Sequence, residues 1–118
     1  LTTYTPAGGS LAGMTGNILV DFGARVATLN NLGFSIGSLV FSNLTGSASF
    51  PTTASGFAGF YTGGQCTGCS AFSATTSSFN AAFIGRSGAG LVFSTTMVTG
   101  AGTGAGGSAV GTQVLKAP

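Results

Sequence analysis

The feature that most constrains the fold is the alternation of apolar and polar residues on both sides of one short turn. It lies in residues 79–98, FNAAFIGRSGAGLVFSTTMV, with the turn at residues 87–90. A repeat of two residues is the signature of a β-strand with one buried face. The alternating apolar residues are Phe79, Ala81, Phe83, Leu91, Phe93 and Met97. The segment therefore predicts a β-hairpin with an aromatic inner surface.

Shorter runs of the same kind fill most of the chain, with turn residues between them and no helical periodicity. They cover residues 16–22, 25–29, 32–41, 45–50, 56–61 and 70–76. The inward residues expected in the first and third runs are Ile18, Val20 and Phe22, then Phe34, Ile36 and Val40. Many short strands at this spacing predict an all-β fold, a single small antiparallel barrel or sandwich of about eight strands.

Small residues at expected interior positions favour the tight core of a small barrel, although a sandwich stays open. They are Gly46, Ala48, Ala58 and Ala81, and each is expected to lie opposite a large phenylalanine. An eight-stranded barrel leaves only enough interior space for side chains to fill. The pattern alone does not separate the two architectures.

The chain divides into three predicted parts. Residues 1–13 form an N-terminal arm marked by Pro and Gly, which is either flexible or a single edge strand around residues 2–5. Residues 14–99 form the β-domain, and residues 100–118 form a Gly-rich linker followed by one more strand. That last strand contains Val110, Val114 and Leu115. Two interpretations stay open for it: it returns to its own sheet, or it pairs with a neighbouring subunit, because an added strand satisfies a free sheet edge.

Charge is unusually scarce. Charged residues make up 3% of the chain, whereas about a quarter is typical of soluble domains. The ionised side chains are those of Asp21, Arg25, Arg86 and Lys116. A surface of hydroxyl, amide and apolar groups has little charge repulsion, so the expected partner is a second copy of the chain. Three scattered basic residues cannot neutralise a run of phosphates, and nucleic acid is not expected as a partner.

Export is expected, although the sequence shows no targeting segment. No stretch approaches the roughly 18 continuous apolar residues of a helical membrane span, so none is predicted. The first residues, LTTYTPAGGS, lack the basic start and apolar middle of a signal peptide. The expected location is extracellular or at the cell surface, after export and processing.

The residue inventory argues against catalysis. His is absent and Asp21 is the only side-chain carboxylate, which removes a Ser-His-Asp triad, a Cys-His pair, a two-carboxylate glycosidase and a His-based metal site. The glycines of residues 100–107 lack the Lys-Ser/Thr that completes a phosphate-binding loop. We therefore expect no enzyme activity, no catalytic residues, no cofactor and no metal.

Two local motifs remain. Cys66 and Cys69 form a C-x-x-C motif, which occurs in redox centres and as half of a zinc site. The expected helix of a redox centre and the further ligands of a zinc site are missing, so a loop disulfide is the favoured interpretation. Asn43-Leu44-Thr45 is an N-glycosylation sequon, which makes Asn43 a candidate for modification.

Two segments also carry a recognisable pattern. Its residues are Gly16, Ile18, Asp21 and Phe22 in a G-x-[apolar]-x-x-D-F strand, and Phe79, Ala81, Phe83, Gly85, Leu91 and Phe93 around the turn of the central hairpin. The pattern resembles the hairpins of the small eight-stranded barrel in transferrin-binding-protein-like bacterial surface lipoproteins and in barrel domains appended to some FecR-type proteins. The resemblance implies a bacterial cell-surface or secreted β-barrel without enzymatic activity.

The chain departs from that family pattern in three ways. It lacks the charged loops of a host-protein binder, it has no lipidated Cys at its start, and it continues for about twenty residues past the closing strand. These departures weigh against ligand binding and leave the expected fold unchanged.

Two functional hypotheses follow. The first is a non-enzymatic extracellular structural subunit that self-assembles into a filament, sheath or surface layer, with strand exchange through Val110, Val114 and Leu115 as one route. The alternative is a monomeric cell-surface barrel that binds a host protein, glycan or small ligand through its loops. In that case the Cys66–Cys69 bridge would stiffen the recognition loop.

Overall fold

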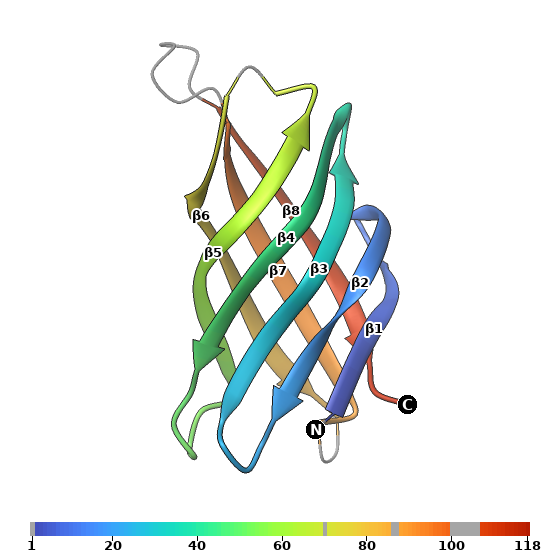
Figure 1. Cartoon of the computed structure of the whole chain (residues 1–118). Coiled ribbons are helices and arrows are strands. Elements are labelled where there is room, and N and C mark those ends of the chain that lie inside the picture. The colour runs from blue at the N-terminus through green and yellow to red at the C-terminus, as the bar shows by residue number, and fades with distance from the viewer. Residues whose placement is uncertain (1, 70, 86–87, 100–106) are drawn as a thin grey trace.

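The computed structural model describes residues 2–69, 71–85, 88–99 and 107–118, and within them the chain forms a closed antiparallel barrel (Figure 1). Each strand pairs with its neighbours in sequence, and the last strand returns to the first. The strands are β1 (Thr2–Gly9), β2 (Ala12–Asp21), β3 (Val26–Ile36), β4 (Leu39–Ser49), β5 (Gly56–Thr67), β6 (Phe72–Ile84), β7 (Gly90–Thr99) and β8 (Gly107–Lys116). The predicted all-β fold of about eight strands is confirmed, and of the two architectures it is the barrel.

The terminal segments are strands of this barrel, so the predicted arms are not confirmed. β1 pairs with β2 from Thr2 to Tyr4, and then with β8 from Thr5, opposite Lys116, to Gly9, opposite Gln113. β8 also pairs with β7 along its whole length. Of the two interpretations of the last strand, the structure has the one in which it returns to its own sheet. The predicted linker falls mostly in residues 100–106, outside the described residues.

Three side chains predicted to point inward are exposed, and glycines explain two of them, Val40 and Ala58. The third, Phe22, is 44% exposed because it follows the last residue of β2 and lies at the end of the barrel, where its ring packs on Phe50 and Phe83. Val40 is 43% exposed, because the chain turns at Gly37, which has a φ of 60°, and the alternation restarts in β4 with Phe41 inside. Ala58 is exposed, because Gly59 takes the interior position between the buried Phe57 and Tyr61. Gly59 has no side chain to mark its inward position, so the sequence pattern of β5 predicts the wrong face for Ala58.

The central hairpin is confirmed as the pairing of β6 with β7, from Ile84 opposite Gly90 to Phe72 opposite Thr99. Its inward side chains form the middle of the core, where the Phe79 ring stacks on Phe93 at 6.2 Å between centroids and meets Tyr61 edge-on at 5.3 Å. Gly46 and Gly59 face the Phe79 ring from β4 and β5. A Cβ at either position would lie 3.2 or 3.0 Å from the ring.

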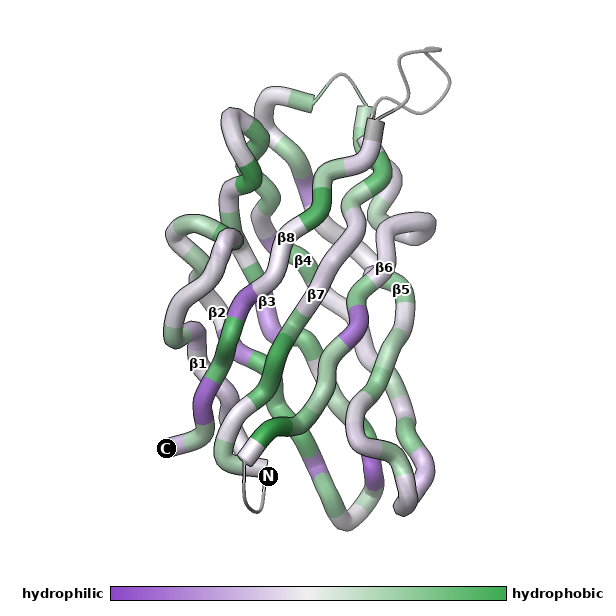
Figure 2. Tube along the Cα trace, turned by 180° about the vertical axis from the view of Figure 1, so that it is seen from behind, coloured by the Kyte–Doolittle hydropathy of each residue, from purple (hydrophilic) through white to green (hydrophobic). Residues whose placement is uncertain are grey.

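Two further aromatic clusters close the barrel at its ends. At the end of the β2–β3 turn, the clustered rings are Phe22, Phe50, Phe57 and Phe83, with neighbouring centroids 5.2 to 6.3 Å apart. At the other end, Phe41 packs on Phe34 at 5.7 Å and on Phe72 at 5.3 Å. Figure 2 shows the alternation of apolar and more polar residues along the strands that produces this filled interior. The inside of the barrel is a packed core.

Close contact between β5 and β6 gives a first prediction. A Cβ on Gly56 would overlap the carbonyl oxygen of Ala81 on β6, whereas a Cβ on Gly63 in the same strand would meet only the Thr45 hydroxyl, at 3.2 Å. Gly56→Ala should therefore lower the free energy of unfolding by about 1–3 kcal/mol, because the backbone of a ladder cannot move aside as a side chain can. Denaturant titration of both variants measures this, and equal losses for Gly56→Ala and the Gly63→Ala control would contradict it.

Candidate functional site

The buried hydroxyl groups of the barrel are hydrogen-bonded, whereas Oε1 of the buried Gln113 on β8 has no partner among the described residues. The hydroxyls of Tyr61 and Thr95 are 2.7 Å apart, and Thr95 donates to the carbonyl oxygen of Ser78 at 2.9 Å. Ser77 donates to the carbonyl of Ser73 and accepts from the amide of Val98. Burial raises the pKa of Tyr61 above its ordinary value of 10.0, and the hydrogen bond to Thr95 offsets part of that rise. These groups tie strands β5, β6 and β7 together, and their role is structural.

This internal hydroxyl pair predicts a pH effect on stability. Because the folded pKa of Tyr61 is raised, its contribution is complete below about pH 10 and is lost as the pH rises further and the unfolded state releases the proton. Tyr61→Phe should cost about 1 kcal/mol at neutral pH, since Thr95 keeps its bond to Ser78, and should make the loss of stability above pH 10 shallower.

Thermal melts across the pH range test this effect. Some alkaline destabilisation should remain in the variant, because burial also raises the pKa of Tyr4. An alkaline slope as steep in Tyr61→Phe as in the parent protein would contradict the assignment.

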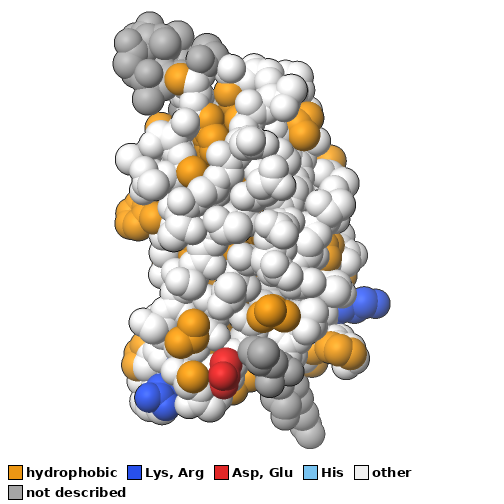
Figure 3. All heavy atoms as spheres, viewed as in Figure 1, with side chains coloured by type: hydrophobic (Ala, Val, Ile, Leu, Met, Phe, Trp, Pro, Cys, Tyr) orange, Lys and Arg blue, Asp and Glu red, His pale blue; other side chains and the backbone are white. Residues whose placement is uncertain are grey.

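The described charged side chains lie at one end of the barrel, where strands β2 and β8 end. Asp21 accepts a hydrogen bond from the amide of Ala24 at 2.9 Å and so fixes the β2–β3 turn, and Arg25 follows with a φ of 59°. Lys116 is the last residue of β8. In Figure 3 the coloured charged groups are confined to the lower part of the visible face, and the wall above them is uncharged. Arg86 lies outside the described residues.

The Cys66–Cys69 disulfide is confirmed and lies at the opposite end of the barrel. It joins the end of β5 to the segment before β6, with the two Cα atoms 5.8 Å apart. Neither cysteine of the described chain is free. Nearby, the side-chain amide of Asn43 donates to Gln65 at 3.0 Å from an exposed position with a φ of 55°. Modification of Asn43 stays a prediction.

Many outward side chains of β2 to β5 are polar, and three pairs of them hydrogen-bond across the strands, although Val40 and Phe60 are exposed on β4 and β5. Asn30 donates to Asn17, and the hydroxyls of Thr45 and Thr62 are 3.1 Å apart. Together with the hydrogen bond between Asn43 and Gln65, these contacts link neighbouring strands on the outer surface of β2 to β5. These side-chain amides and hydroxyls are therefore already hydrogen-bonded within the barrel.

The outward side of β7 and β8 differs, because it is apolar or hydroxyl-bearing as far as Val114, and its one described charge is Lys116 at the end of β8. Val92 lies opposite Val114, and Thr96 lies opposite Val110. Val110 is 64% exposed and Val114 is 41% exposed, whereas Leu115 is fully buried in the core. Of the three residues expected to mediate assembly, only the two valines therefore lie on the surface. We call this surface the β7/β8 face, defined by Val92, Ser94, Thr96, Val98, Ser108, Val110, Thr112 and Val114.

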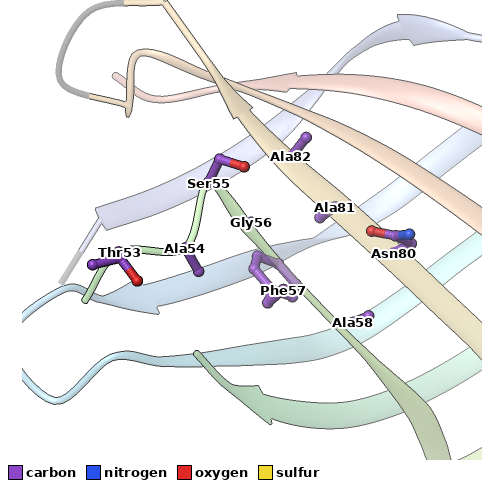
Figure 4. Close-up of a pocket in the computed structure, with 9 residues that line it drawn as sticks. All are labelled: Thr53, Ala54, Ser55, Gly56, Phe57, Ala58, Asn80, Ala81 and Ala82. Atoms are coloured by element: carbon purple, nitrogen blue, oxygen red, sulfur yellow. The ribbon is translucent and has the colours of Figure 1, made fainter. Parts of the chain in front are cut away.

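A shallow depression of about 500 Å³ lies on the neighbouring wall, at the start of β5 (Figure 4). Its lining residues are Thr53, Ala54, Ser55, Gly56, Phe57, Ala58, Asn80, Ala81 and Ala82. Ser55 and Gly56 come from the entry to β5, and Asn80 and Ala82 from β6. The sequence analysis does not predict this site, because it places Ala58 in the interior. The sequence feature that indicates a depression is the small residues in the two paired segments 56–59 and 80–82.

Comparisons with protein families, with curated proteins and with solved structures find no match for this chain. Within the described ranges, no helix has the length and hydropathy needed to cross a bilayer. The same ranges contain no group of three or more His, Cys, Asp or Glu side chains placed to hold a metal ion.

Proposed function

We propose that the protein is a non-enzymatic extracellular structural subunit that self-associates into a filament, sheath or surface layer through its β7/β8 face. The observation that carries the proposal is the exposure of Val110 and Val114, at 64% and 41%, on a stretch of wall whose one described charged side chain is Lys116, at the end of β8. Two such faces bury apolar area when they meet, which stabilises association by about 25 cal/mol per Å² removed from water.

The closed barrel favours contact between faces over exchange of strands. β8 is bonded to β7 along its length and to β1 over its second half, from Gln113 to Lys116. Exchange would first have to break both ladders, whereas a face contact leaves the barrel intact. β-branched side chains such as Val92, Thr96 and Val110 present a regular outer surface that suits packing against a second sheet.

The disulfide supports the proposed location outside the cell. Disulfides persist in oxidising compartments, and the Cys66–Cys69 bridge lies at an end of the barrel, where it holds the connection between β5 and β6. The scarcity of charge supports self-association in the same way, since copies of the subunit approach one another with little electrostatic repulsion.

Charge placed on the face should block assembly. The double variant Val110→Lys/Val114→Lys should weaken self-association at least tenfold, because each contact would then bury like charges against each other. Sedimentation velocity at several concentrations, with negative-stain electron microscopy of the same samples, measures this. Val40→Lys is the matched control, because Val40 is 43% exposed, close to the 41% of Val114, and lies on β4.

Two results would contradict the proposal. Parent protein that stays a monomer at all concentrations would remove self-association altogether. An equal loss of self-association in the double variant and in Val40→Lys would show that added charge anywhere on the surface weakens association. The β7/β8 face would then have no special role.

A second function, that of a monomeric cell-surface binding barrel, is favoured by one observation. The depression beside β5 and β6 offers a concave surface with polar groups, which are the usual features of a small-ligand site. A stable monomer with a saturable ligand would favour this alternative over the structural subunit.

A further inference from the structure

We infer that the depression beside β5 and β6 binds an uncharged glycan, with Phe60 as the aromatic platform for a sugar ring. The site lies on a different face from the one proposed for self-association and goes beyond that proposal. Its leading observation concerns Phe60, whose side chain is 61% exposed. Every other phenylalanine ring in the described chain packs against another aromatic ring.

The depression exists because outward residues on two paired strands are short. Gly56 lies opposite Ala82, and Ala58 lies opposite Asn80. These small side chains form a low floor, bounded at one end by the loop of residues 53–55. Phe60 follows two residues after Ala58 on the same outward face of β5, roughly 7 Å further along the strand. The loop thus bounds the floor at one end, and Phe60, which is not itself a lining residue, is the next outward residue of β5 beyond the floor at the other end.

The polar groups at the depression are neutral and accessible. Asn80 is exposed, and its side-chain amide offers two donors and an acceptor. Thr53 and Ser55 are exposed as well and add hydroxyls that both donate and accept. Figure 4 shows Asn80 on β6 and Thr53 in the loop, at opposite ends of the labelled group. A ligand lying between them could bond at both ends.

These features match the chemistry of a pyranose ring. Its hydroxyls lie around the edge of the ring and exchange hydrogen bonds with amides and hydroxyls, while its C–H face packs on an aromatic ring. No lining residue is charged, so the site offers no cation to pair with a carboxylate, sulfate or phosphate group. The volume of about 500 Å³ falls within the range of about 300–1,000 Å³ typical of small-ligand sites. The geometry therefore points to a neutral oligosaccharide of one or two bound sugar units.

The test is an array of immobilised oligosaccharides that includes neutral glucose, galactose and N-acetylglucosamine oligomers beside sialylated and sulfated ones. We expect the full chain to retain neutral probes only. Titration calorimetry with the best neutral probe should then show affinity at least tenfold lower for Phe60→Ala and for Asn80→Ala. Phe60→Tyr keeps the aromatic face and should stay within about threefold of the parent protein. Both residues are exposed, so the variants should fold as the parent does.

A matched control separates this site from general surface effects. Val40→Ala changes an apolar side chain of 43% exposure on β4, outside the lining residues, and should leave glycan affinity unchanged. Retention of no neutral probe, a preference for anionic probes, or unchanged affinity in both Phe60→Ala and Asn80→Ala would each overturn the inference. Sedimentation of the same variants keeps the two proposals distinguishable, because neither substitution lies on the β7/β8 face.

Discussion

The packing of the Phe79 ring against Gly46 and Gly59 is the contact on which the rest of the barrel depends. An eight-stranded barrel has an interior only wide enough for side chains, so a large ring at its centre needs neighbours without side chains. Gly46 and Gly59 supply that space from β4 and β5, and Phe93 and Tyr61 complete the ring's surroundings. Aromatic clusters also fill both ends, so the interior is packed with side chains. The candidate functional surfaces therefore lie on the outer wall of the barrel.

That outer wall has two unlike sides. Over β2 to β5, outward amides and hydroxyls such as Asn17, Asn30 and Thr45 bond to one another across the strands. Over β5 to β8, the wall carries the depression and then the β7/β8 face, and the two are linked where Ala82 of β6 pairs with Val92 of β7. A subunit that self-associates through the β7/β8 face would therefore carry a depression beside that face. A structural layer built in this way would carry its proposed glycan sites in a repeating array.

Much of the fold could be predicted from the sequence, because alternation with a period of two is a local signal. The β6–β7 hairpin and the strand count could be predicted in that way, and the Cys66–Cys69 bridge could be predicted from its C-x-x-C spacing. Closure of the barrel could not be predicted, because Thr5 pairs with Lys116 across almost the whole chain and no local pattern specifies such a contact. The terminal segments therefore resembled arms.

The surface sites were harder to predict, for a reason that lies in single glycines. Gly59 occupies an inward position without marking it, so Ala58 was assigned to the core and Phe60 was not recognised as an exposed ring. Leu115 was expected on the assembly surface together with Val114. Neighbouring residues of a strand point to opposite faces, so Leu115 lies inside the core.

The central claim, that ring and glycine are matched inside the barrel, is tested most directly by a double-mutant cycle between Gly59 and Phe79. A Cβ at residue 59 would lie 3.0 Å from the Phe79 ring, so Gly59→Ala should destabilise the parent barrel by crowding. In a Phe79→Leu background the ring is gone, and the same substitution should cost less, with a coupling of about 0.5–3 kcal/mol between the two positions. Denaturant unfolding of the four proteins measures that coupling. Simple additivity of the two substitutions would contradict the account.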